Sequence, residues 1–160
     1  MLYFLAGLME LPVKNLEEPP PSRLLRKVDA IFVSSLKMRL LEDPSGIGAA
    51  PLAVVCKDVE KKEQFQERLK SVYKYEVQGG LHGAKARQSL LSDDASQLVY
   101  ASVHAIVYVG LTDEEALRLA SRHNINGHYN HSMTHRDYVS FFYTLFRPYQ
   151  LMRDAHRVFK

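Results

Sequence analysis

The stretch Glu76–Leu91, which reads EVQGGLHGAKARQSLL, decides the fold. Apolar and polar residues alternate over 73–78, which predicts a strand with one inward and one outward face. A glycine pair at 79–80 follows, with a third glycine at Gly83, and residues 84–91 are good helix formers. The sequence therefore predicts a strand, a tight glycine turn and a helix, in that order.

A glycine turn of this kind is a common place for an anion. The first N–H groups of the helix and the positive end of its dipole point at one spot, and glycine lets the backbone approach a ligand closely. His82 and Lys85 add two donors or cations beside it. The glycine spacing fits neither the P-loop nor the dinucleotide fingerprint. The turn therefore predicts a phosphate site, and the open alternative is a tight turn without a ligand.

The composition is that of one globular domain with a mild positive charge. The chain has 160 residues, 46% of them hydrophobic, and a formal net charge of +3, which is compatible with a polyanionic partner. Its single cysteine, Cys56, lies in an apolar run and is predicted to be buried. Because no second cysteine can form a disulfide, we expect an intracellular protein of the cytoplasm or nucleus. Met1–Leu8 is apolar but too short to span a bilayer, so we expect a buried end or the edge of a longer chain and no membrane partner.

Hydrophobic spacing and helix breakers predict the other elements. The first long helix is expected to begin at an N-cap, Ser22, and to end at Glu42. The other predicted elements are an extended piece over 10–16, strands over 51–56 and 101–109, a surface helix over 59–70, a helix over 113–123, and C-terminal helices over 137–146 and 149–159. This order predicts an α+β fold in which a small sheet packs with helices and a helical tail follows.

Three stretches of the chain resemble the ParB/sulfiredoxin superfamily. They are VQGGLHGAKA at 77–86, GLTDEEAL at 110–117 and HNIN at 123–126, and the front half adds ELPVKNL at 10–16, Pro-Ser-Arg at 21–23 and PLAVV at 51–55. The resemblance implies an α+β fold, with a small mixed sheet packed with helices, in a domain over residues 9–136. Residues 137–160 are then a helical extension that we expect to pack on this domain.

Members of this superfamily place a glycine-rich turn against the phosphates of a nucleotide. ParB proteins use CTP as a switch while they clamp DNA, and sulfiredoxins and free serine kinases of this fold use ATP or ADP chemistry. The resemblance thus implies a nucleotide triphosphate, CTP or ATP, with Mg²⁺ as an accompanying ion. It also implies DNA and further copies of the chain as candidate partners. The implied nucleotide-binding residues are Gly79, Gly80, Leu81, His82, Gly83, Lys85 and Asn124.

The chain departs from the superfamily at positions that carry chemistry. Leu81 stands where sulfiredoxins have their cysteine, so sulfiredoxin activity is excluded for lack of a nucleophile. Leu81 also stands at the acidic position of ParB, whose paired arginines become His82 and Gly83. The second ParB element, Glu-Asn-x-Gln-Arg, is HNING at 123–127 here, so its asparagine remains while its glutamate and arginine are gone.

Two functions therefore stay open. The first is a nucleotide-binding ParB-like domain of a DNA-associated protein. If it is catalytic, it is a nucleotide hydrolase or phosphotransferase, but we assign no catalytic residue because the only acid next to the turn, Glu76, precedes it. The second is a non-catalytic module that binds DNA or protein through its helices. We expect Gly80→Val to abolish nucleotide binding while the protein stays folded.

Several candidate residues also have purely structural interpretations. Lys85, expected in the first helical turn, opposes the helix dipole unless an anion is bound; its alternative is a solvated surface lysine. Asn124 contacts a ligand or caps the preceding helix in a left-handed conformation. The histidines at 123, 128, 131 and 135 have no Cys, Asp or Glu among them, so we predict polar loop histidines and no zinc.

Overall fold

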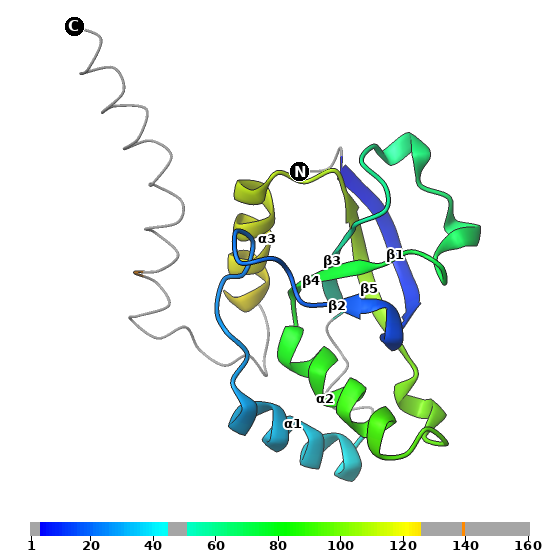
Figure 1. The fold of residues 1–160 in the computed structure, drawn as a ribbon, viewed down its shortest axis with the longest axis vertical. Helices are drawn as coiled ribbons and strands as arrows, with labels where there is room; N and C mark the ends of the chain where they lie inside the picture. Colours follow the sequence, from blue (N-terminus) through cyan, green and yellow to red (C-terminus); the bar gives the residue numbers. More distant parts are fainter. Residues whose placement is uncertain (1–3, 45–50, 126–138, 140–160) are drawn as a thin grey trace, which may run out of the picture.

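The computed structural model describes residues 4–44, 51–125 and 139, which form a mixed sheet with helices around it (Figure 1). The five strands lie in the order β1-β5-β3-β4-β2. The bounds of the strands are β1 Leu5–Pro12, β2 Leu16–Glu17, β3 Leu52–Cys56, β4 Tyr75–Gly79 and β5 Ser102–Val109. The bounds of the helices are α1 Ala30–Glu42, α2 Leu81–Asp93 and α3 Asp113–Ile125. The α+β architecture predicted from the sequence is confirmed for these residues.

The sheet combines parallel and antiparallel pairs around a buried central strand. β5 pairs antiparallel with β1 and parallel with β3, and β4 pairs antiparallel with β3 and parallel with β2. All five residues of β3 are buried, which agrees with its continuous apolar sequence. The predicted strands over 51–56 and 101–109 are confirmed to within one residue.

The three helices cover the sheet in different ways. Leu81 and Ala84 of α2 join the core on one face, whereas Ala116 and Leu119 of α3 pack on Ala53 and the rest of the opposite face. α1 packs on α2 rather than on the sheet (Figure 1). Two layers of helix therefore lie on the α2 side and one on the α3 side. No helix within the described residues is long and apolar enough to cross a membrane.

The second face of β4 is buried, not outward as its alternation predicts. Glu76 and Gln78 are only 7% and 6% exposed, because α3 packs against this strand. Burying a carboxylate is costly unless it is paired, and Glu76 pairs with Arg23. The side-chain amide of Gln78 has no hydrogen-bond partner among the described residues.

The first helix begins later than predicted. Its N-cap is Asp29, not Ser22, and the Asp29 carboxylate accepts hydrogen bonds from the N–H groups of Ile31 and Phe32, at 2.9 and 3.1 Å. The segment before it is held elsewhere because the Arg23 guanidinium binds residues 53 and 90 positions further along the chain. The predicted end at Glu42 is confirmed.

The charged segment over 59–70 is not a helix. It contains two short 3-10 turns, Lys62–Gln64 and Glu67–Leu69. Tyr73 explains part of the difference, because its ring packs on Phe65 and its hydroxyl accepts a hydrogen bond from the backbone N–H of Gln66. These contacts hold the segment beside Tyr73, and Phe65 also packs against the core.

The two ends of the chain differ in how far they are described. The expected buried end over 1–8 is in part the edge strand β1, which begins at Leu5 and leaves Leu8 64% exposed. The predicted C-terminal helices and the extension over 137–160 lie outside the described residues, except for position 139.

Candidate phosphate site at the start of α2

The glycine turn ends β4 and begins α2 at a left-handed residue. Gly80 is the N-cap, with φ 85° and ψ 21°, and no side chain caps the helix there. The first intrahelical hydrogen bond runs from the N–H of Ala84 to the carbonyl of Gly80, at 3.0 Å. The N–H groups of residues 81–83 precede this bond and have no partner within the helix. This is the backbone arrangement that binds anions.

Helix α2 is longer than predicted, and this changes the position of the third glycine. It begins at Leu81 rather than residue 84, so Gly83 lies in its first turn and not in the loop. The reason is the positive φ of Gly80, which completes the turn in one residue.

Close packing leaves no room for a side chain at two of the three glycines. A β-carbon at Gly79 would overlap the ring of His123, and one at Gly80 would overlap the side chain of Leu52. His123 is held in place by Pro51, whose carbonyl oxygen lies 3.0 Å from His123 Nε2. Turn geometry and packing are therefore sufficient to explain Gly79 and Gly80.

Gly83 differs from the other two glycines. A β-carbon there would have Nη1 of Arg87 at 3.6 Å, which is an ordinary contact, and the residue is partly exposed. Glycine inside a helix costs about 0.5–1 kcal/mol relative to alanine. Packing does not explain this cost, so Gly83 is the glycine that points to a close approach of something else to the backbone.

His82 is buried and faces α1 instead of the open side of the turn. It is 8% exposed, and its Nε2 accepts a hydrogen bond from the backbone N–H of Asp29 at 3.0 Å. The edge of the ring also contacts Phe32, with the ring centroids 5.3 Å apart. His82 therefore joins the starts of α1 and α2, and the bond from Asp29 places the proton of the neutral ring on Nδ1.

Lys85 and Leu81 also differ from the sequence-based prediction in their surroundings. Lys85 lies beyond the first turn, with Nζ 3.7 Å from a carboxylate oxygen of Glu18, and its side chain is 35% exposed. Its charge is therefore balanced by a surface acid. Leu81 is 9% exposed and belongs to the core on the α2 face, so its side chain is not available to a ligand.

The end of α3 brings the second sequence element close to the turn. Asn124 lies in the last turn of α3, which continues to Ile125, and no non-glycine residue with positive φ occurs among the described residues. The predicted left-handed cap at Asn124 is therefore wrong. Of the four histidines, His123 contacts the turn, while those at 128, 131 and 135 lie outside the described residues.

Sequence reasoning missed Arg87, which lies one helical turn after Gly83. Arg87 is 6% exposed, which makes it the most buried Lys or Arg in the described part of the chain. Its Nη1 lies 3.5 Å from the carbonyl oxygen of Gly83. Burial lowers the pKa of the guanidinium, and Tyr100 opposes this effect. The spacing of four residues between Gly83 and Arg87 could have predicted that they are neighbours, because helical side chains lean toward the N-terminus.

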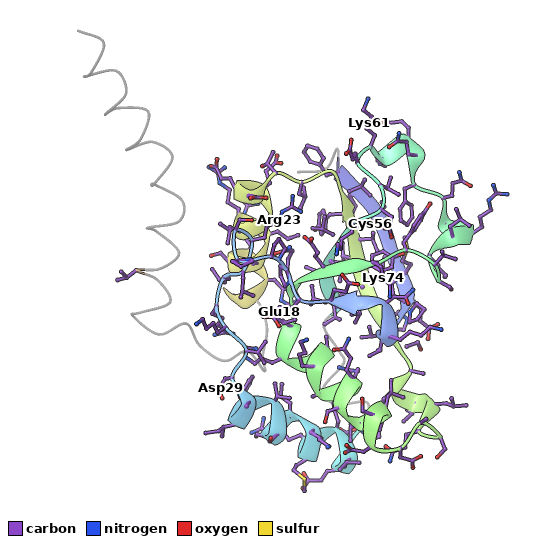
Figure 2. The ribbon with its side chains drawn as sticks, in the orientation of Figure 1. Glu18, Arg23, Asp29, Cys56, Lys61 and Lys74 are labelled. Carbon is purple, nitrogen blue, oxygen red and sulfur yellow. The ribbon has the colours of Figure 1, made fainter. Side chains whose placement is uncertain are left out.

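A second cluster of charges lies toward the start of β4, away from the glycine turn. Figure 2 shows Arg23 beside α3 and Asp29 at the start of α1. The Arg23 guanidinium donates to Asp113 at 2.6 Å, to Glu76 at 3.2 Å and to the carbonyl of Leu111 at 3.1 Å. The hydrogen bond from Arg23 holds the pKa of Asp113 below its usual value. Glu76 is thus committed to Arg23.

The same cluster lines a pocket of about 510 Å³. Lys57 and Cys56 contribute from the end of β3, and Gly110 follows the end of β5. Burial raises the pKa of the Cys56 thiol, which is 3% exposed, so the predicted buried cysteine is confirmed.

Comparison with known proteins supports the fold. No family model matches the sequence, and no curated protein matches it. Among solved structures, the chain is similar to the crystal structure of the C-terminally truncated chromosome-partitioning protein ParB from Caulobacter crescentus, complexed with CTP-gamma-S. The TM-score is 0.50 at 15% identity, and the match covers 90% of this chain and 65% of that chain, so this chain spans less than two thirds of its neighbour. The protein therefore has a ParB-like α+β fold.

Proposed function

We propose that this domain binds the phosphates of a nucleotide triphosphate at the start of α2. The observation that carries the proposal is Gly83, a first-turn helical glycine that packing does not require. A missing side chain at this position opens the N–H groups of the first turn to a ligand. As a glycine, the N-cap Gly80 has no side chain of its own that could occupy these N–H groups.

CTP and ATP are the candidate ligands. The ParB structure that resembles this chain holds a CTP analogue, and this supports CTP as the first nucleotide to test. Mg²⁺ in such sites is held through substrate phosphates and one or two carboxylates. Asp29 is the carboxylate at the start of the neighbouring helix, but it caps α1. We therefore expect Mg²⁺ to contribute through the phosphates more than through the protein.

We propose binding without catalysis. Hydrolysis or transfer needs a general base close to the transferred phosphate. Leu81 is packed in the core at the position where ParB proteins have an acid, and the Glu76 carboxylate is paired with Arg23. These two observations also favour the second candidate, a module that binds DNA or protein and uses no nucleotide.

A thermal-shift series with CTP, ATP, GTP and ADP, each with and without Mg²⁺, tests the proposal. A ligand at a hundred times its dissociation constant stabilises the folded state by about 2.7 kcal/mol. The informative variant is Gly83→Glu, since its carboxylate suits a helix start but repels phosphate. Gly83→Gln is the neutral control of the same size. We expect Gly83→Glu to remain folded and to lose the nucleotide shift, with a smaller loss for Gly83→Gln.

The same experiment decides between the two candidates. If no nucleotide raises the melting temperature of the unmodified protein, nucleotide binding is wrong. Gel shifts with duplex DNA at two salt concentrations then test the second candidate, because contacts to DNA phosphates weaken steeply as salt increases. DNA binding that appears only with CTP supports a nucleotide-dependent DNA-associated protein.

A further inference from the structure

We propose that the outer face of α1 is the surface on which the C-terminal segment of this chain, residues 137–160, docks. The inference concerns a different surface from the glycine turn and does not depend on nucleotide binding. It starts from an imbalance in α1, because this helix has apolar residues on two faces and α2 covers one of them. A helix that is apolar on all sides is typical of a buried position.

The inner face of α1 packs against α2. Leu36 and Leu40 are 3% and 0% exposed, and Phe32 and Val33 pack against the same cluster. The carbonyl of Leu40 also accepts a hydrogen bond from the hydroxyl of Tyr100 at 2.8 Å. These contacts fix the orientation of α1, so its opposite face points away from α2 (Figure 1).

The opposite face of α1 carries an exposed apolar stripe. Ile31 is 84% exposed, Met38 60% and Leu41 46%, and we call these three residues the outer stripe. They stand at i, i+7 and i+10, which places them along one side of the helix. Ser34 lies between them, and its hydroxyl donates to the carbonyl of Ala30 at 3.0 Å. Within residues 4–44, 51–125 and 139, no other helix or strand has as many exposed large hydrophobic side chains.

The end of α3 lies close to the start of α1. A β-carbon at Gly80, the N-cap of α2, would be 3.8 Å from His123 Cε1, and His82 accepts the hydrogen bond from the N–H of Asp29, the N-cap of α1. Because α3 ends at Ile125, 11 residues (136 − 125) connect it to residue 137. Such a connection spans up to about 35–40 Å, whereas α1 is about 20 Å long. The C-terminal segment can therefore reach every part of the outer stripe.

The composition of residues 137–160 fits an apolar surface. These 24 residues hold seven of the 16 Phe and Tyr residues of the chain. Four apolar residues recur at the spacing of one helix face, namely Tyr138, Phe141, Phe142 and Leu145. Burying this face and the outer stripe against each other removes both from water. A segment on a short linker has an effective concentration of about millimolar, which favours it over a second copy of the chain.

Limited proteolysis of the full chain, without nucleotide, tests the proposal. The rate at which trypsin cleaves after Arg147 and Arg153 follows the fraction of molecules whose segment is undocked. We expect Met38→Asp to raise this rate about tenfold or more, since it replaces a buried methionine contact with a charge. Val72→Asp is the matched control and should be cleaved like the unmodified protein, because Val72 is 71% exposed and precedes β4, whose other end leads into α2. Equal rates for the unmodified protein and Met38→Asp would overturn the proposal.

Cross-linking identifies what covers the outer stripe. In a Cys56→Ala background, Met38→Cys and Phe142→Cys are joined by a short bis-maleimide. We expect a cross-linked monomer whose yield does not change with protein concentration, and little product when Val72→Cys replaces Met38→Cys. Cross-linked dimers whose yield rises with concentration would assign the stripe to a second copy and overturn the proposal. Should Met38→Asp fail to fold by its melting curve, the cross-linked monomer decides, and its absence overturns the proposal.

Discussion

The imidazole of His123 occupies the space in which a β-carbon at Gly79 would have to lie. The last turn of α3 and the end of β4 are therefore interlocked, although 44 positions separate the two residues (123 − 79). The bond between His123 and the Pro51 carbonyl extends this contact to the start of β3. The glycine turn is consequently held in position by contacts with the end of α3 and the start of β3.

Gly79→Ala should destabilise the protein by about 1–3 kcal/mol, because a methyl group is forced against the His123 ring. Urea unfolding of Gly79→Ala, His123→Ala and the double variant measures the coupling of the two sites. The double variant should be more stable than the sum of the single effects predicts. Gly83→Ala is the matched control and should be neutral or stabilising by up to about 1 kcal/mol. Additive effects would show that the two residues do not interlock.

The same steric argument changes the test that the sequence suggests for the phosphate site. The sequence predicts that Gly80→Val removes binding and keeps the fold, but Gly80 has a positive φ and its β-carbon would overlap Leu52. We now expect Gly80→Val to unfold the protein or lower its melting temperature strongly. A melting temperature within a few degrees of the unmodified protein would contradict this.

His82→Leu should cost about 0.5–1.5 kcal/mol, because it removes the acceptor of the partly buried N–H of Asp29. His82→Gln is the matched variant, since its side-chain carbonyl can accept the same hydrogen bond. Chemical denaturation of both variants measures the difference. If both variants lose the same stability, the hydrogen bond to α1 contributes little and the ring acts only by packing.

Asp113→Asn should lower stability at neutral pH and have no effect in acid. The pKa of Asp113 is lower in the folded state because Arg23 donates to its carboxylate. A group of this kind stabilises the folded state above its unfolded pKa, about 3.9, and this stabilisation is lost as the pH falls through the folded value. The side chain is 52% exposed, so we expect no more than about 1 kcal/mol.

Urea unfolding of the protein and of Asp113→Asn, from neutral pH down into acid, checks this difference. Glu114→Gln is the control, because Glu114 also lies in the first turn of α3 but pairs with Arg118 on the exposed face. A difference between the protein and Asp113→Asn that persists in acid would mean that the loss comes from packing and not from charge.

Cys56 should react slowly with iodoacetamide in the folded protein. Its thiol is 3% exposed and burial raises its pKa, so little of the reactive thiolate is present or reachable near neutral pH. Mass spectrometry of the alkylated protein, with and without urea, measures the rate. Leu98→Cys in a Cys56→Ala background is the positive control because Leu98 is 75% exposed. Equal rates for the two cysteines would contradict the burial.

Local sequence patterns predicted the elements that local interactions determine. The apolar run of β3 is buried throughout. At the start of α3, whose sequence TDEE at 112–115 has the spacing of a capping box, the N–H of Thr112 donates to the Glu115 carboxylate at 2.9 Å and the N–H of Glu115 donates to the Thr112 hydroxyl at 3.3 Å. The capping box depends on no partner far along the chain, and the unbroken apolar run of β3 shows that both of its faces are covered without showing by which elements.

Several differences from the sequence-based predictions involve partners that are distant in sequence. Arg23, in the segment before α1 that was predicted to be helical, has acceptors 53 and 90 positions away. The burial of Glu76 and Gln78 depends on α3 covering β4, which alternation alone does not reveal. At the candidate site, the glycines and their approximate geometry were predictable. The direction of His82 was not, because it is set by the start of another helix.

The pairing of β1 with β5 determines how much of the chain must be synthesised before the domain can fold. Among the described strands, the first along the chain forms its ladder with the last, between Leu5–Pro12 and Ser102–Val109. Joining segments so far apart costs loop-closure entropy, which slows folding. A nascent chain that has not yet emerged beyond Val109 therefore carries an N-terminal strand without its neighbour. Ribosome-bound intermediates should stay sensitive to proteases until that point, and then become resistant in one cooperative step.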